Sequence, residues 1–339
     1  MFENPSKKMH MIVISSIIII IFLSSFNIVS AQTSNEKPLR LSVGIWPPNF
    51  LAYVAQEKGY FEKNNVDVNL TLAQDYAGTL TDYANGEYDG MFVVYSDAII
   101  QNSEGIDTKV VFNTDIAKDA DPIIGNVDNL TELKGKKVGV DGINSFSHYY
   151  ILESLKKVGL DEGDVEFASI PVQNMSDALK KGEIDAGHFY NPYSLDALKS
   201  EFKILSTGAI VPGVLTTVLA FHSDVVEQRP NDIKNIIKSL VEAKEDYEKN
   251  KEQDIKIMSV KTGVNKTDII KGLDDAEVMD LEHNSQISMN KELNTSASLY
   301  TSGNSIADFF AERGVISKYP NFQYIIEPKF VNELLIEKK

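Results

Sequence analysis

The chain has 339 residues, 43% of them hydrophobic and 24% charged, which is the composition of a folded protein long enough for two compact units. Its formal net charge of −16 argues against nucleic acid as a partner, because phosphate binding needs a basic surface. The absence of cysteine excludes disulfides, a lipid-modified cysteine, thiol catalysis and thiolate metal sites, and we expect no cofactor or bound metal.

Residues 1–31 have the layout of a secretory signal peptide. Lys7 and Lys8 precede a long apolar run, and small residues up to Ala31 follow it. The alternative is an uncleaved membrane anchor, since the apolar run is near the lower limit for spanning a bilayer. Both interpretations predict an exported protein, periplasmic or extracellular and associated with the cell surface.

The first part of the exported chain predicts the order strand, helix, strand, helix, strand. Strands are expected at 39–44, 66–73 and 88–95, and helices at 51–59 and 79–86. This order is typical of a parallel sheet with right-handed crossovers.

The same order then recurs. Short strands at 109–115 and 121–126 precede a second module, whose strands begin at 138, 164 and 184 and whose helices span 146–158 and 175–181. A strand is expected within 214–226, and the remainder predicts helices at 231–250, 254–261, 265–273 and 291–313. The sequence therefore predicts two α/β modules.

Polar and aromatic residues follow five of the predicted strands. Ligands of open parallel sheets bind outside the carboxyl ends of the strands, and aromatic side chains are costly to leave on solvated loops. The alternative is that these are ordinary polar loops. The candidate ligand-binding residues are Trp46, Asn49, Asp75, Tyr76, Tyr95, Ser96, Asp97, Asn144, Ser145, Ser147, His148, Tyr190, Asn191 and Tyr193.

The helix expected from 146 offers a specific hypothesis. Unpaired N–H groups at its start, with the hydroxyls of Ser145 and Ser147, suit an anionic or hydrogen-bond-accepting group. Alternatively Asn144 or Ser145 only caps the helix, and the two roles are compatible. His148 either donates to a ligand or has a structural role, whereas His188 lies within a strand and is expected in the core.

The charges near the predicted site bear on the ligand. The three arginines, Arg40, Arg229 and Arg313, all lie away from the strand ends. Aspartates lie near the strand ends of lobe one instead: Asp75, Asp97, Asp115, Asp119 and Asp121. This favours a neutral or amine-bearing ligand, such as a flat heterocycle, over nitrate or a sulfonate. Helix ends, neutral donors or Lys118 could still hold an anion, and Trp46 could stack on a ligand or pack at the lobe edge.

Several segments together resemble one protein family. Residues 44–70 contain "KGYF" and "VDV", 130–140 read "LTELKGKKVGV", 178–193 read "ALKKGEIDAGHFYNPY", and 298–316 read "SLYTSGNSIADFFAERGVI". In this order they resemble the extracytoplasmic solute-binding proteins of ABC transporters. The branch is that of nitrate, sulfonate, taurine and thiamine-pyrimidine-precursor binders. The family often has glutamate where Asn191 stands.

The resemblance implies an α/β fold of the type II periplasmic-binding-protein kind. Each of its two lobes would be a mostly parallel sheet flanked by helices, with two hinge crossings between the lobes. Lobe one would be 37–127 plus 214–339 and lobe two 128–213, with hinge positions at Gly125, Gly208, Pro212 and Gly213.

The resemblance also implies the function. We expect a monomer that is not an enzyme, and that captures a small polar or heterocyclic solute and delivers it to a membrane ABC permease. The alternatives are an exported sensory protein of this fold and an enzyme similar to the thiamine-pyrimidine synthases. Those enzymes carry a cysteine-rich motif that is missing here, and no nucleophile next to a base is evident in the sequence.

Overall fold

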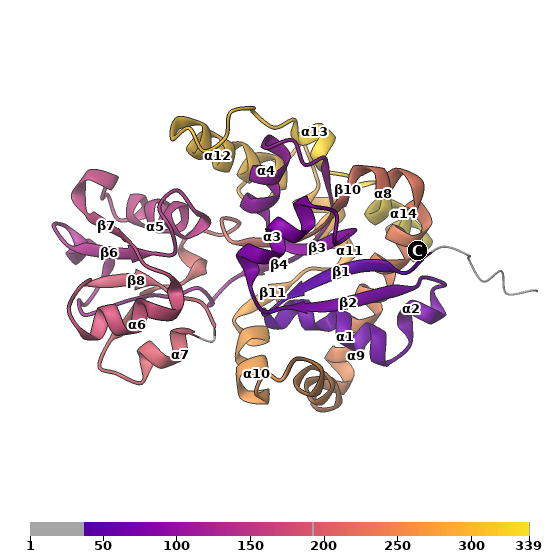
Figure 1. The fold of residues 1–339 in the computed structure, drawn as a ribbon, viewed down its shortest axis with the longest axis horizontal. Helices are drawn as coiled ribbons and strands as arrows, with labels where there is room; N and C mark the ends of the chain where they lie inside the picture. Colours follow the sequence, from indigo (N-terminus) through magenta and orange to yellow (C-terminus); the bar gives the residue numbers. More distant parts are fainter. Residues whose placement is uncertain (1–36, 192, 339) are drawn as a thin grey trace, which may run out of the picture. The chain divides into compact units, whose positions relative to one another are not determined.

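The computed structural model describes residues 37–191 and 193–338 (Figure 1). From Pro38 onward the chain forms one compact unit, which contains two β-sheets. The predicted signal peptide or anchor, residues 1–31, lies outside the described residues. Among the described helices, none combines the length and the apolar character needed to cross a bilayer.

The first sheet has the strand order β11-β4-β10-β3-β1-β2. The parallel strands β2, β1 and β3 are those of the first predicted module, while β10, β4 and β11 join the sheet in antiparallel pairs. The strands are β1 (Leu39–Gly44), β2 (Val68–Ala73), β3 (Gly90–Val94), β4 (Thr108–Ala117), β10 (Thr216–His222) and β11 (Ala276–Val278).

The second sheet has the order β7-β6-β8-β5-β9. Its parallel strands β7, β6 and β8 are those of the second predicted module, and β5 pairs antiparallel with both β8 and β9. The strands are β5 (Ile123–Gly125), β6 (Lys137–Val140), β7 (Glu166–Ser169), β8 (Ala186–His188) and β9 (Lys203–Ser206).

These sheets confirm the predicted α/β fold and show that each is mixed, because β10 and β11 run opposite to the first module and β5 runs opposite to the second. The chain passes from the first sheet to the second between β4 and β5 and returns between β9 and β10. Near the return, Gly213 has φ +84°, and any side chain there would clash with the backbone carbonyl of Ser296. The predicted lobe bounds remain a prediction. β5 precedes residue 128, the predicted start of lobe two, but it pairs with strands of the second sheet.

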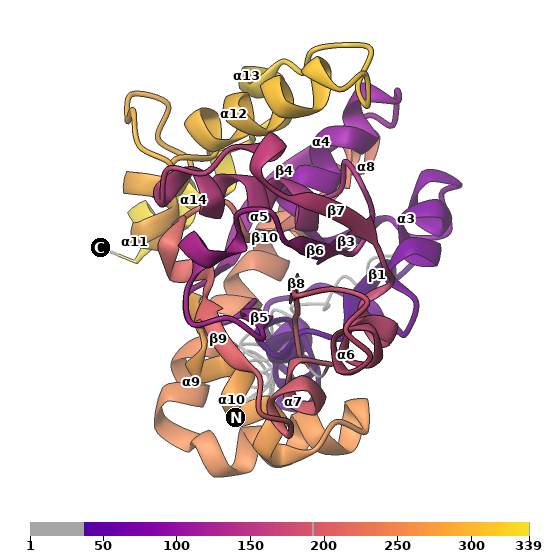
Figure 2. The same ribbon diagram turned by 90° about the vertical axis from the view of Figure 1, so that its left-hand side faces the viewer.

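Helices cover both faces of each sheet (Figures 1 and 2). On the first sheet, α1 and α9 lie on one face and α3 and α4 on the other, and on the second sheet α5 lies opposite α6 and α7. The helices are α1 (Leu51–Glu57), α2 (Tyr60–Lys63), α3 (Tyr76–Ala84), α4 (Tyr95–Ser103), α5 (Phe146–Lys157), α6 (Val172–Lys180), α7 (Tyr193–Leu198), α8 (Ser223–Gln228), α9 (Pro230–Thr262), α10 (Lys266–Asp274), α11 (Leu281–His283), α12 (Leu299–Glu312), α13 (Phe322–Ile325) and α14 (Lys329–Glu337).

Two C-terminal helices differ from the predictions. The helices expected at 231–250 and 254–261 are one element, α9, with non-helical backbone angles at Asn250. The helix expected from 291 begins only at Leu299. The hydroxyls of Ser298 and Thr301 donate to the carbonyls of Asn290 and Leu293, which holds the intervening residues in a loop.

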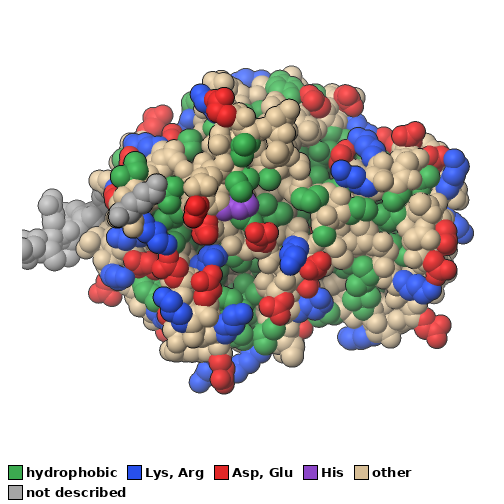
Figure 3. Space-filling view, turned by 180° about the vertical axis from the view of Figure 1, so that it is seen from behind, with side chains coloured by type: hydrophobic (Ala, Val, Ile, Leu, Met, Phe, Trp, Pro, Cys, Tyr) green, Lys and Arg blue, Asp and Glu red, His purple; other side chains and the backbone are tan. Residues whose placement is uncertain are grey.

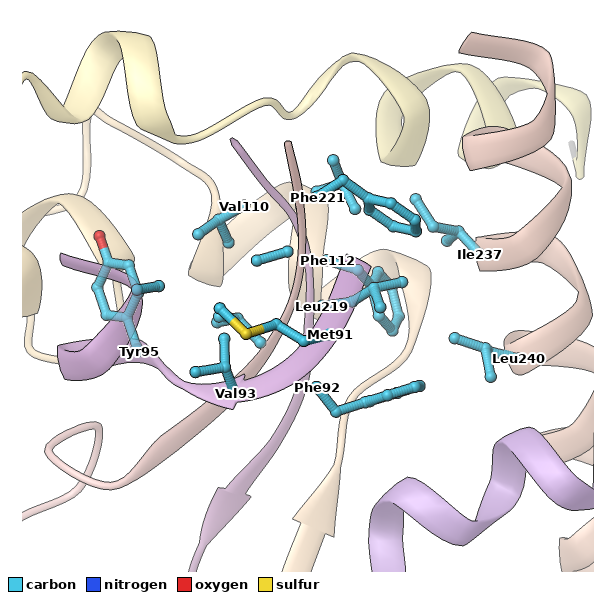
Figure 4. Packing of buried hydrophobic residues seen from close by; sticks show 14 of the residues in the cluster. Met91, Phe92, Val93, Tyr95, Val110, Phe112, Leu219, Phe221, Ile237 and Leu240 are labelled. Carbon is cyan, nitrogen blue, oxygen red and sulfur yellow. The ribbon is translucent and has the colours of Figure 1, made fainter. Parts of the chain in front are cut away.

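The main core lies around the central strands β3, β4 and β10 (Figure 4). Phe92, Phe112 and Phe221 are buried there and point toward Ile237 and Leu240 of α9. Two smaller apolar clusters lie mainly around the second sheet. The clusters overlap at their borders, since the main one includes Tyr149 and Leu152 of α5 and a smaller one includes Ala117 of β4.

Candidate ligand site

The sheet topology gathers the residues that follow the parallel strands. Because β1 lies between β2 and β3, Trp46, Tyr76 and Asp97 come from one edge of the first sheet. Because β6 lies beside β8, Asp141 and Tyr190 come from one edge of the second sheet. The predicted grouping of strand-end residues is therefore present in each sheet.

Three aromatic side chains at these edges each donate their polar hydrogen to an aspartate. The pairs are Trp46 Nε1 to Asp115 Oδ1 (2.7 Å), Tyr76 Oη to Asp97 Oδ2 (2.7 Å) and Tyr190 Oη to Asp141 Oδ2 (2.8 Å). These bonds fix the orientation of each ring. We call these six residues the aromatic–aspartate site.

The aromatic–aspartate site spans both sheets. Trp46, which follows β1, packs against an apolar cluster that contains mainly second-sheet residues and also Ala117 of β4. The Tyr190 hydroxyl adds to the rise in the pKa of Tyr76, although burial and Asp97 are the larger causes. The site therefore combines two pairs from the first sheet with one from the second.

Burial perturbs two carboxyl groups of the site. It raises the pKa of Asp97 to about 6, against the opposing effect of the hydrogen bond from Tyr76. It raises the pKa of Asp115 to about 7, where hydrogen bonds from Trp46 and Thr114 oppose the shift and the charge of Asp121 adds to it. Burial therefore disfavours the charged form of both carboxyl groups more than their hydrogen bonds favour it.

Basic side chains do not supply the missing charge. Among the described residues, no lysine or arginine forms an ion pair with Asp97, Asp115 or Asp141. Arg40 pairs instead with Asp89, and Arg313 pairs with Glu162. On the face drawn in Figure 3, basic and acidic side chains are interspersed rather than gathered by sign.

Replacing Asp115 with asparagine should make the protein more stable at pH 8 and leave its stability nearly unchanged at pH 4. An acid whose pKa is raised on folding contributes stability below its unfolded pKa, and this contribution is lost as pH rises through the folded value of about 7. Asparagine can still accept the hydrogen bond from Trp46. We expect a gain of at least about 1 kcal/mol at pH 8, measured by denaturant unfolding. An equal effect at both pH values would contradict the assigned cause.

The polar groups at the start of α5 form hydrogen bonds with one another. Ser145 is the N-cap, as predicted: its Oγ accepts from the His148 N–H (3.4 Å) and donates to the Gly142 carbonyl (2.7 Å). The Asn144 N–H donates to His148 Nδ1 at 3.1 Å. These polar groups bind one another, so the predicted contact with an anionic group has few donors left to make it.

His148 has a structural environment. It is buried against the rings of Phe167 and Phe309, and burial lowers its pKa. Its Nε2 lies 3.7 Å from Glu162. Because Phe309 belongs to α12 and His148 to α5, this contact packs the two helices together.

Ser147 and His188 form a hydrogen-bonded chain that the sequence did not reveal. Ser147 Oγ lies 2.9 Å from His188 Nδ1, and His188 Nε2 lies 3.2 Å from Asp121 Oδ1. No local pattern in the sequence indicates this contact, because the two residues are 41 apart in the chain. Ser147 is nonetheless fully buried and accepts a further bond from the Asp141 N–H, so its hydroxyl cannot reach a substrate. His188 is in the core, as predicted.

Other predicted residues occupy different surroundings. Tyr95 is fully buried and donates to the Leu299 carbonyl at 2.9 Å, so it joins α4 to α12 rather than facing the other sheet. Asp75 is exposed just before α3. Asn191 is buried and accepts from Ser194 Oγ (2.6 Å), and Tyr193 is exposed with its ring edge-on to Tyr190.

Two predicted residues retain unused hydrogen-bonding capacity. The amide oxygen of Asn49 and the hydroxyl of Ser96 are buried and have no partner among the described residues. Asn49 follows β1 and Ser96 follows β3, which are neighbouring strands. Asp141 was not among the predicted site residues, although its place directly after β6 was a usable signal.

Comparison with known proteins identifies the family. Residues 32–260 match the model of the NMT1-like family. The chain belongs to the NMT1-like family. This NMT1-like protein is 31% identical over 162 residues to a Haemophilus influenzae protein named for thiamine biosynthesis, covering 46% of this chain and 50% of that one. It is 29% identical over 119 residues to the taurine-binding periplasmic protein of Escherichia coli, covering 34% and 37%.

The NMT1-like chain also shares its fold with solved structures. The periplasmic aliphatic sulphonate-binding protein of Escherichia coli aligns with a TM-score of 0.72 and 18% identity over 88% of this chain and 99% of that one. A desulfurization enzyme aligns with a TM-score of 0.65 and 13% identity over 90% and 100%. These findings confirm the resemblance and the fold, and the matched segments cover half or less of the two curated relatives.

Proposed function

We propose that this NMT1-like protein is exported, captures a small polar or heterocyclic solute between its two lobes, and delivers the solute to a membrane ABC permease. The observation that carries the proposal is the aromatic–aspartate site, in which the strand ends of both sheets carry aromatic rings bonded to aspartates. Relatives named as taurine- and sulphonate-binding periplasmic proteins support it. Monomeric action would suit such a role.

Capture would exploit the two crossings between the sheets. Trp46 follows β1 and packs on a cluster made mainly of second-sheet residues, so opening the lobes would expose part of its ring. A solute could then replace part of this contact and be enclosed when the lobes close. The binding free energy would come from aromatic burial and from directed polar contacts.

We assign no catalytic activity to the protein. The sulphonate- and taurine-binding relatives are binding proteins, whereas the likeness to the desulfurization enzyme is one of fold alone. The buried Ser147 also lacks the access that a nucleophile needs.

Thermal unfolding of the full chain with pyrimidines, amines, sulfonates and nitrate tests the proposal. A bound solute at one hundred times its Kd should add about 2.7 kcal/mol to the free energy of unfolding. Trp46→Ala should weaken binding of the stabilising solute, while Tyr319→Ala, at a half-exposed ring, should not. If no solute class stabilises the chain, or if Trp46→Ala binds as tightly as the parent, the proposed site is refuted.

A further inference from the structure

We propose that the solute is a small organic cation, with its N–H⁺ groups held by Asp97 and Asp115 and its body against the rings of Trp46, Tyr76 and Tyr190. This inference rests on the proposed function and specifies the chemistry of the same site. It follows from which hydrogen-bonding groups of the site already have a partner within the protein and which do not.

The neutral donors of the aromatic–aspartate site are already used. The indole N–H of Trp46 and the hydroxyls of Tyr76 and Tyr190 each donate to a carboxylate at 2.7–2.8 Å. At the start of α5, Ser145 Oγ donates to a backbone carbonyl. A sulfonate or nitrate needs such donors or an arginine, and would meet carboxylates instead.

Two buried polar groups of the predicted site remain without a partner among the described residues. The buried Asn49 amide oxygen has no partner among the described residues, and an amide oxygen can only accept. Ser96 Oγ, next to Asp97 in the chain, is also buried without a partner in the described structure. An unpaired amide oxygen, a hydroxyl that can accept or donate, and carboxylates without a lysine or arginine partner together favour a ligand that brings hydrogen-bond donors and positive charge.

The rings complete the match to a cation. Indole and phenol faces attract cations, and the attraction strengthens when water is excluded. Because each polar hydrogen points at a carboxylate, the negative charge lies at the ring edge, where a bound cation would meet both ring and carboxylate. A flat or compact body with an amine or amidine group satisfies the rings, the carboxylates and the acceptor of Asn49 together.

Three molecules of nearly equal shape test the charge directly: benzamidinium, neutral benzamide and anionic benzoate. We expect benzamidinium to raise the Tm of the full chain the most. Asp97→Asn and Asp115→Asn each keep the acceptor for the aromatic donor but remove a charge, and each should weaken benzamidinium binding roughly tenfold to one hundredfold. Glu104→Gln, an exposed change at the other end of α4, is the matched control and should have no effect.

The remaining outcomes separate this inference from the proposed function. Greater stabilisation by benzoate or benzamide, no shift with benzamidinium, or unchanged benzamidinium affinity in both aspartate variants would overturn the cationic assignment. In each case, stabilisation by another solute of the wider panel would leave the solute-binding function standing. Only the failure of every solute class would remove both.

Discussion

Replacing Lys58 with methionine should destabilise the protein by about 3–5 kcal/mol, because it removes the counter-charge of a buried pair of carboxylates. Lys58 follows α1 and forms ion pairs with Asp246 and Asp254 of α9. The Asp254 side chain is completely buried, and burial raises its pKa even with the lysine present. Methionine has a similar length but leaves both acids without a cation.

Urea unfolding at several pH values measures this effect. Without Lys58 the folded-state pKa values of both acids should rise, so the loss of stability is present at pH 7–8 and shrinks as pH falls through those values. Adding Asp254→Asn to Lys58→Met should recover part of the loss. Lys63→Met is the matched control, since that exposed lysine pairs with Glu242 at the surface and should cost no more than about 1 kcal/mol. A similar cost for the two lysines would show that the buried triad is unimportant.

Replacing Phe221 with alanine should also cost about 3–5 kcal/mol, because the cavity cannot be refilled from the neighbouring strand. Phe221 is fully buried in β10 and pairs directly with Gly90 of β3. Its ring lies over that glycine: a Cβ added at Gly90 would sit 2.5 Å from two ring carbons. The position opposite the ring therefore has no side chain that could move into the space.

A double-mutant cycle sharpens this prediction. Gly90→Ala alone should destabilise by about 1–3 kcal/mol through overpacking. In the Phe221→Ala background the same added methyl group should cost less, because the ring carbons are gone and only Leu41 Cδ2, at 2.8 Å, still crowds it. Val260→Ala, at an exposed position of α9, should change stability by less than about 0.5 kcal/mol. If Gly90→Ala destabilises both backgrounds equally, the ring does not occupy the space over Gly90.

The parallel half of each sheet could be predicted because its information is local. Apolar runs, helical spacing and turn residues lie within short windows, so β1, α1, β6 and α5 appear close to their predicted bounds. The antiparallel additions were harder, because the direction in which β4 or β10 joins the sheet depends on distant partners. The start of α12 was missed because hydroxyl-to-carbonyl bonds hold the preceding segment in a loop.

The site was predicted in part for the same reason. Trp46, Tyr76, Asp97 and Tyr190 follow apolar strands, and the topology brings them to the strand ends. Tyr95 follows β3 as well, yet the first turn of α4 directs it into the core, where it meets Leu299. Position after a strand predicts the neighbourhood of a residue but not the direction of its side chain.

The sequence by itself determined the two α/β modules, the acidic and aromatic character of the strand ends, and the family. Only the tertiary structure decided which donors and acceptors remain for a ligand. Trp46 and Asp115 are 69 residues apart, and Tyr190 and Asp141 are 49 apart. Such bonds form only when the folded backbone brings their ends within about 3 Å, and no local pattern in the chain encodes that approach.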